Sequence, residues 1–212
     1  MASNTPLKVL QTVNQNDAFN APTKKIKVHA SNTSGLLKLL ASMSMISEDT
    51  IQTKFNQQRD ASTTVTISFY VQKDGTTINL QFFPNEWDAD QELPLASVPF
   101  SNCQAVLLYY VGENDSSWKT VKEMTTRWGL CAPPNTPCIV ACKGTDPDKE
   151  EHEKEVKSQD QMQLFHLSDV SASQQLLSFI VDQVGSVDSS SGDVGDNGGN
   201  RSSEESDEFS GY

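Results

Sequence analysis

The chain has 212 residues, of which 36% are hydrophobic and 8% aromatic, enough for one α/β domain but short for two independent cores. Its 16 lysines and arginines are outnumbered by 28 aspartates and glutamates, which gives a formal net charge of −12. This balance argues against a nucleic-acid partner, because no basic stripe is present to displace the counterions of phosphate groups. No segment approaches the ~20 consecutive apolar residues of a membrane span, and residues 1–22 lack the apolar core of a signal peptide.

The cysteines and histidines predict neither a disulfide framework nor a metal site. No Cys-x-x-Cys pair occurs, and the three histidines offer no partner at a typical ligand spacing. We therefore expect reduced, mostly buried thiols in a cytosolic protein. The residues concerned are Cys103, Cys131, Cys138, Cys142, His29, His152 and His166.

Composition divides the chain into three parts. Residues 186–212 contain eight serines, five glycines and seven acidic residues, so they have too little apolar surface to offset the entropy cost of ordering them. We expect these residues to form a disordered acidic tail, and the polar residues 1–23 to form a flexible N-terminal segment. Residues 24–185 remain as one domain.

The first half of this domain predicts a strand, a helix and a hairpin. Ile26, Val28 and Ala30 alternate as in a short strand, and a Ser-Asn-Thr-Ser-Gly turn follows. Apolar residues at positions 36, 39, 40 and 43 then recur with the spacing of a helix that faces the core. Apolar residues alternate on both sides of Asp74-Gly75, a dipeptide that tolerates positive φ, and predict an antiparallel hairpin over residues 63–83.

The second half predicts a parallel sheet. Residues 105–111 and 138–142 are continuous apolar runs, which are typical of strands buried on both faces beneath helices. Together with the hairpin, they indicate an α/β domain with a mostly parallel sheet and one antiparallel hairpin strand.

Helices and a last strand complete this half. Asp115 or Ser116 is expected to cap a helix between the two apolar runs. Residues 148–159 read as a charged helix or loop, and residues 164–167 as the last strand. Ser171 is expected to cap the final helix.

The turn after the first strand carries a resemblance to a known family. The run Ala30-Ser31-Asn32-Thr33-Ser34-Gly35-Leu36-Leu37 resembles the phosphate loop of Ras-like GTPases, Gly-x-x-x-x-Gly-Lys-[Ser/Thr], and the element order over residues 24–185 is similar to theirs. In that family the lysine reaches the phosphates and the hydroxyl binds Mg²⁺. Here Gly35 is kept, while Leu36 and Leu37 replace the lysine and the hydroxyl residue. The resemblance implies a P-loop GTPase-like three-layer sandwich in which Leu36 and Leu37 pack the first helix onto the sheet.

Three further motifs of the family are degraded. The Asp-x-x-Gly motif aligns with Pro84-Asn85-Glu86-Trp87, and the Ser-Ala-Lys motif aligns with Ser168-Asp169-Val170. The guanine-binding Asn-Lys-x-Asp motif aligns with Cys142-Lys143-Gly144-Thr145, which keeps Lys143 but places the acidic residue, Asp146, one position late. The comparison predicts a non-enzymatic pseudoGTPase without cofactor or metal, in which Lys143 is a surface lysine at a strand end.

A narrower resemblance involves the strand that precedes the lost Asp-x-x-Gly motif. The run Ile78-Asn79-Leu80-Gln81-Phe82-Phe83-Pro84-Asn85-Glu86-Trp87 is similar to one in the alpha- and gamma-adaptin-binding protein family. This resemblance implies a cytosolic domain that binds clathrin adaptor complexes, or assists their assembly, in vesicle trafficking.

Two segments offer candidate partner-binding residues. The loop over residues 84–100 carries Trp87, Leu93 and Phe100, which either bind a partner or pack back onto the domain. The acidic tail ends with Phe209 and Tyr212 and resembles the acidic-phenylalanine motifs that adaptor appendage domains recognise, although a solvated tail is the alternative.

Two other functions or folds stay open. A divergent Rab-type GTPase that still hydrolyses GTP is the competing function, but it lacks the lysine and the hydroxyl. Cys142 is the last cysteine, so we expect no prenylation motif and no direct membrane anchor. An unrelated doubly wound fold would have a parallel first pair of strands in place of the hairpin.

Overall fold

The computed structural model describes residues 7–61, 65–86 and 103–186. These residues form one seven-stranded, mostly parallel β-sheet and six helices. The strands are β1 (Lys8–Leu10), β2 (Thr23–Ala30), β3 (Ile67–Lys73), β4 (Thr76–Glu86), β5 (Ala105–Val111), β6 (Cys138–Lys143) and β7 (Met162–Leu167). The helices are α1 (Gln15–Asn20), α2 (Thr33–Ser44), α3 (Glu48–Ala61), α4 (Asp115–Cys131), α5 (Lys149–Lys157) and α6 (Val170–Ser186).

The sheet has the order β1-β3-β4-β2-β5-β6-β7. Strand β2 pairs in parallel with β4 and β5, and β5, β6 and β7 continue the parallel pairing. Strands β3 and β4 pair antiparallel through Asp74 and Gly75, whose φ angles of 50° and 79° are those a two-residue hairpin turn requires. The predicted hairpin and the mostly parallel sheet are thus confirmed. The alternative of an unrelated doubly wound fold required a parallel pair of strands in place of the hairpin, and β3 and β4 are antiparallel.

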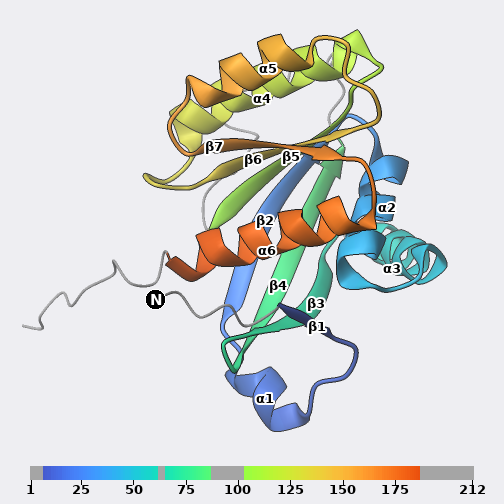
Figure 1. Cartoon of the computed structure of the whole chain (residues 1–212). Helices are drawn as coiled ribbons and strands as arrows, with labels where there is room; N and C mark the ends of the chain where they lie inside the picture. The colour runs from blue at the N-terminus through green and yellow to red at the C-terminus, as the bar shows by residue number, and fades with distance from the viewer. Residues whose placement is uncertain (1–6, 62–64, 87–102, 187–212) are drawn as a thin grey trace, which may run out of the picture.

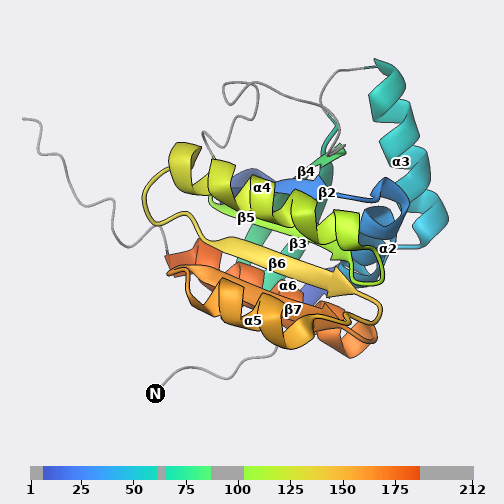
Figure 2. The same cartoon turned by 90° about the horizontal axis from the view of Figure 1, so that it is seen from above.

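Helices cover both faces of the sheet. Figure 1 shows α4 and α5 together on one face and α6 on the other, an arrangement compatible with a three-layer α/β sandwich. One apolar cluster joins α2, α3 and α6 to the sheet, and a second joins α4 and α5 to the opposite face. Figure 2 shows the arrowhead of β6 directed toward the end of the molecule where α2 and α3 lie.

Strand β5 shows why the sequence has continuous apolar runs. Its residues alternate between the two clusters: Leu107 and Tyr109 pack toward α2 and α6, whereas Leu108 and Tyr110 pack toward α4 and α5. Every side chain from Ala105 to Tyr110 is buried. A strand covered by helices on both faces has no solvent-facing positions, so polar residues do not alternate along it.

The helix caps differ from the prediction by one or two residues. Helix α4 is capped by Asn114, whose side chain accepts a hydrogen bond from the Ser116 amide, rather than by Asp115 or Ser116. Helix α6 begins at Val170, and the Asp169 side chain accepts from the Ala172 amide at 2.9 Å in place of Ser171. Asn, Asp and Ser all cap helices well, so neighbouring candidates of these types compete and the turn geometry selects among them.

The structure also contains elements that the sequence analysis did not predict. Residues 7–23, expected to be flexible, include β1, which pairs with β3, and the short helix α1. Helix α3 was not predicted because few apolar residues mark it, chiefly the buried Ile51 and Phe55. Residues 148–159, left open as helix or loop, contain α5, and β7 begins at Met162, two residues earlier than expected. The predicted disorder of the tail concerns residues that, apart from Ser186, lie outside the described ones.

In the described part of the chain, no helix combines the length and the apolar character that crossing a lipid bilayer requires.

Candidate functional site

The carboxyl ends of β2, β5, β6 and β7 meet at one edge of the sheet, since these strands are parallel. Ligands of open α/β sheets bind outside this edge. The turn between β2 and α2, which carries the phosphate-loop resemblance, lies there as well. This edge is therefore the candidate functional site.

The turn from β2 to α2 is short, and three of its backbone amides are bonded within the protein. Only Ser31 and Asn32 separate the strand from the helix. The Asn32 side chain accepts a hydrogen bond from the Gly35 amide at 2.7 Å, and its carbonyl accepts from the Leu36 amide at 3.1 Å. The Ser31 amide donates to the Tyr109 carbonyl at 3.1 Å. A phosphate bound at a helix N-terminus needs first-turn amides as donors, and here the Asn32 side chain already uses that of Gly35.

The three residues of the degenerate phosphate loop have structural roles. Leu36 and Leu37 are only 1% and 3% exposed and belong to the core cluster beneath α2, which confirms the prediction that they pack the helix onto the sheet. A Cβ atom added at Gly35 would lie 2.5 Å from the Tyr109 hydroxyl oxygen. The glycine is therefore explained by the close packing of this tyrosine.

A cavity of about 390 Å³ lies next to this turn. Apolar and polar groups both line it, and the structure brings Gly35 and Lys143 of the degenerate motifs together there. Lys143 is exposed at the end of β6, and its ammonium group lies 3.5 Å from the Leu167 carbonyl. Burial raises the pKa of the Tyr109 phenol, which also lines the cavity, to about 12, so this group stays neutral at physiological pH.

Asp146 lies elsewhere. Its carboxylate is 1% exposed and belongs to a network on the α4/α5 side of the sheet. It accepts a hydrogen bond from the Tyr110 hydroxyl at 2.7 Å and from the Asp148 amide at 3.2 Å, and it lies 2.9 Å from Nδ1 of His152. Burial alone would raise the pKa of Asp146, but the hydrogen bonds from His152 and Tyr110 outweigh it and lower the pKa. Lys143 and Asp146 thus do not form a common base-binding pair.

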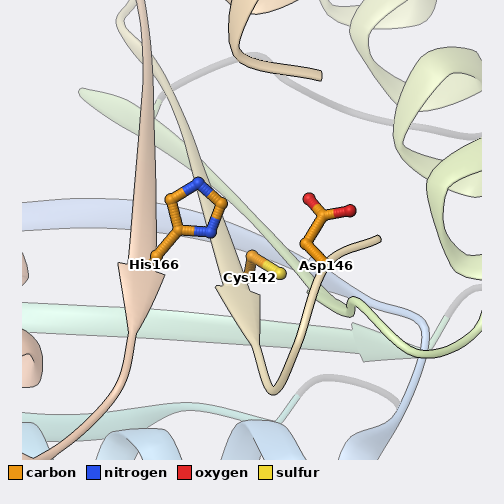
Figure 3. A group of neighbouring side chains, drawn as sticks. All are labelled: Cys142, Asp146 and His166. Carbon is orange, nitrogen blue, oxygen red and sulfur yellow. The ribbon is translucent and has the colours of Figure 1, made fainter. Parts of the chain in front are cut away.

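The structure gathers a group of side chains that the sequence analysis did not connect. Cys142, Asp146 and His166 lie side by side at the end of β6 and the adjoining part of β7 (Figure 3). Cys142 and His166 are 24 positions apart in sequence but are direct partners in the β6–β7 register. The sequence alone does not indicate this group, because predicting it requires knowing how β6 and β7 are paired.

The structure does not describe the candidate partner-binding residues. Trp87, Leu93, Phe100, Phe209 and Tyr212 all lie outside the described residues. Pro84, at the start of the candidate loop, is buried within β4.

No protein-family model matches the chain, and a search of curated proteins found no match.

Proposed function

We propose that this chain is a Ras-like pseudoGTPase that does not bind GTP and that acts as a non-catalytic protein-interaction module in the cytosol. Its proposed partners are clathrin adaptor subunits, and its proposed role is to bind adaptor complexes or to assist their assembly in vesicle trafficking. The observation that carries the proposal is the self-capped, leucine-filled N-terminus of α2. The Asn32 side chain occupies the Gly35 amide there, and the leucine side chains of α2 are buried in the core.

The architecture supports the Ras-like part of the proposal. The sheet is mostly parallel, carries one hairpin and has helices on both faces. Strand β2 leads directly into α2 at the edge where ligands of such sheets bind. Among the described strands, the added strand β1 lies at the sheet margin beside β3 and leaves this arrangement unchanged.

Energetics support the loss of nucleotide binding. A charge-assisted hydrogen bond contributes roughly 1.5–3 kcal/mol, and each 1.4 kcal/mol is about tenfold in affinity. Replacing the lysine by Leu36 removes one such bond, and replacing the hydroxyl residue by Leu37 removes a ligand of the Mg²⁺ ion. Breaking the bonds of Asn32 to free the amides would cost further free energy. These losses together weaken triphosphate binding by several orders of magnitude.

The proposed absence of GTP binding is tested by thermal unfolding of the full chain with and without GTP and Mg²⁺. A ligand at 100 times its Kd stabilises a protein by roughly 2.7 kcal/mol, so a working GTPase with micromolar affinity shows a clear rise in Tm at submillimolar GTP. We expect no rise for this chain, with a small GTPase measured in parallel as the positive control. A clear rise at micromolar GTP would instead favour the Rab-type alternative.

The proposed binding to clathrin adaptors is tested separately, by a pull-down of purified adaptor subunits with the full chain. The variant carrying Trp87→Ala and Phe209→Ala is expected to lose the adaptor. Phe19→Ala is the matched control, because Phe19 is 90% exposed on α1 and outside both candidate segments. The adaptor assignment is wrong if the unmodified chain retains no adaptor subunit, and the candidate surface is wrong if the double variant binds as well as Phe19→Ala.

A further inference from the structure

The group formed by Cys142, Asp146 and His166 has the composition of a transition-metal site. A thiol sulfur, a carboxylate oxygen and an imidazole nitrogen lie within 4.8 Å of one another. Figure 3 shows them converging from three segments: the end of β6, the loop that follows it, and β7. This convergence is independent of the nucleotide-site resemblance.

The backbone holds these segments in place. The parallel register of β6 and β7 pairs Cys142 directly with His166. Gly144, at a φ of 88°, turns the chain after β6 and brings Asp146 back toward Cys142. Gly112, at the end of β5, makes room for this loop, since a Cβ there would lie 2.9 Å from the Cys142 sulfur.

The donor atoms have capacity left for a cation. An ionised carboxylate offers about four lone-pair positions, and Asp146 uses three of them, for Tyr110, His152 and the Asp148 amide. Nε2 of His166 is buried and has no hydrogen-bond partner among the described residues, although it lies 3.5 Å from a Glu153 carboxylate oxygen. The His166 side chain is 26% exposed, whereas Cys142 and the Asp146 side chain are buried.

We propose that Cys142, Asp146 and His166 bind a zinc ion, with water as the fourth ligand. A set of one thiolate, one imidazole and one carboxylate suits zinc better than the hard cations Mg²⁺ and Ca²⁺, which prefer oxygen ligands. Tetrahedral zinc at about 2.0–2.3 Å from its ligands separates the donors by roughly 3.5 Å. Spacings of up to 4.8 Å therefore require side-chain movements of about 1 Å on binding.

The surrounding groups favour this geometry. Tyr110 and His152 hold the Asp146 carboxylate in one orientation, as outer partners of metal ligands do. The bound ion would link β6, its following loop and β7 into one unit.

Cobalt(II) is the probe that reads out these ligands directly. The full chain is freed of metal with a chelator, dialysed and titrated with Co²⁺. We expect saturation near one equivalent, with a thiolate-to-cobalt charge-transfer band and the visible bands of a tetrahedral ion. Added Zn²⁺ should remove both, because zinc binds such sites more tightly than cobalt.

Variants assign the ligands. Cys142→Ser is expected to abolish the charge-transfer band, while Cys131→Ser, which changes the exposed cysteine, is expected to retain it. His166→Gln alters a partly exposed side chain at the sheet edge and is expected to weaken Co²⁺ binding at least tenfold while the circular dichroism spectrum stays native. If Cys142→Ser does not fold, the Co²⁺ affinity of His166→Gln tests the proposed site instead.

Either of two results overturns the proposal. The first is that the unmodified chain shows no charge-transfer band or that the band survives in Cys142→Ser; the second is that His166→Gln binds Co²⁺ as tightly as the unmodified chain. Neither outcome touches the proposed pseudoGTPase function, since GTP binding and adaptor binding are measured without this metal.

Discussion

Lowering the pH from 7 to 5 is expected to destabilise the protein through one buried side chain, His29. This residue lies on β2 and is 6% exposed. Burial, and secondarily the nearby Lys27, lower the pKa of His29 from 6.5 to about 4. The unfolded chain therefore takes up a proton near pH 6.5 while the folded chain does not, and stability falls as the pH drops through this window.

The size of the effect follows from the two pKa values. Their difference of about 2.5 corresponds to roughly 3 kcal/mol, which is lost in full only below pH 4. Between pH 7 and pH 5 the loss amounts to about 2 kcal/mol, a large part of a typical folding free energy. This window lies above the ordinary carboxylate range, so the buried Asp146, whose pKa is lowered, stays ionised throughout it.

Urea unfolding of the full chain at pH 7 and pH 5 measures this loss. His29→Gln is the comparison variant, because it keeps a polar side chain of similar size but cannot take up the proton; it should lose about 2 kcal/mol less than the unmodified chain over the same interval. An NMR titration of the His29 ring gives its folded-state pKa directly. Equal losses in the two proteins, or a ring that titrates near 6.5, would refute the reasoning.

Three further substitutions test the description of the candidate site, each by the free energy of unfolding. Gly35→Ala should destabilise the protein by about 1–3 kcal/mol because its Cβ would lie 2.5 Å from the Tyr109 hydroxyl, whereas Gly129→Ala on α4, with nothing within 4 Å, should stabilise it by about 0.5–1 kcal/mol. Equal effects at the two glycines would contradict the packing argument. Asn32→Ala removes the cap of α2 and should cost about 1 kcal/mol, and an unchanged stability would mean that the cap is dispensable. Asp146→Ala should cost about 3 kcal/mol because buried donors lose their acceptor, and a loss below 1 kcal/mol would show that the network is already hydrated.

The parts of the fold that local pattern determines were predictable from the sequence. The Asp74-Gly75 turn with alternating flanks predicted the hairpin, and continuous apolar runs predicted the central parallel strands. In the same way, the apolar stripe at positions 36, 39, 40 and 43 predicted the core-facing side of α2, which the structure confirms. In each case the signal lies within about ten residues of sequence.

Features that depend on long-range geometry were not predictable. The neighbourhood of Cys142 and His166 requires the β6–β7 register, which no local pattern encodes. The role of Gly35 depends on a tyrosine that follows it by 74 positions and that looked like one more apolar residue in a buried run. Helix α3 was missed for a different reason, because its stability derives from a few contacts with α2 rather than from an extended apolar stripe.

The strand at the beginning of the described chain affects how the sheet meets other molecules. Residues 8–10 pair with residues 70–72 of β3, so the amides and carbonyls on that margin of the hairpin are engaged over three positions. An open margin invites strand addition by another chain, and a few capping residues are enough to discourage it. Removing the first ten residues would therefore do more than shorten the protein: it would uncover a template for self-association, and preparations lacking them should be checked for aggregation before they are used in any binding assay.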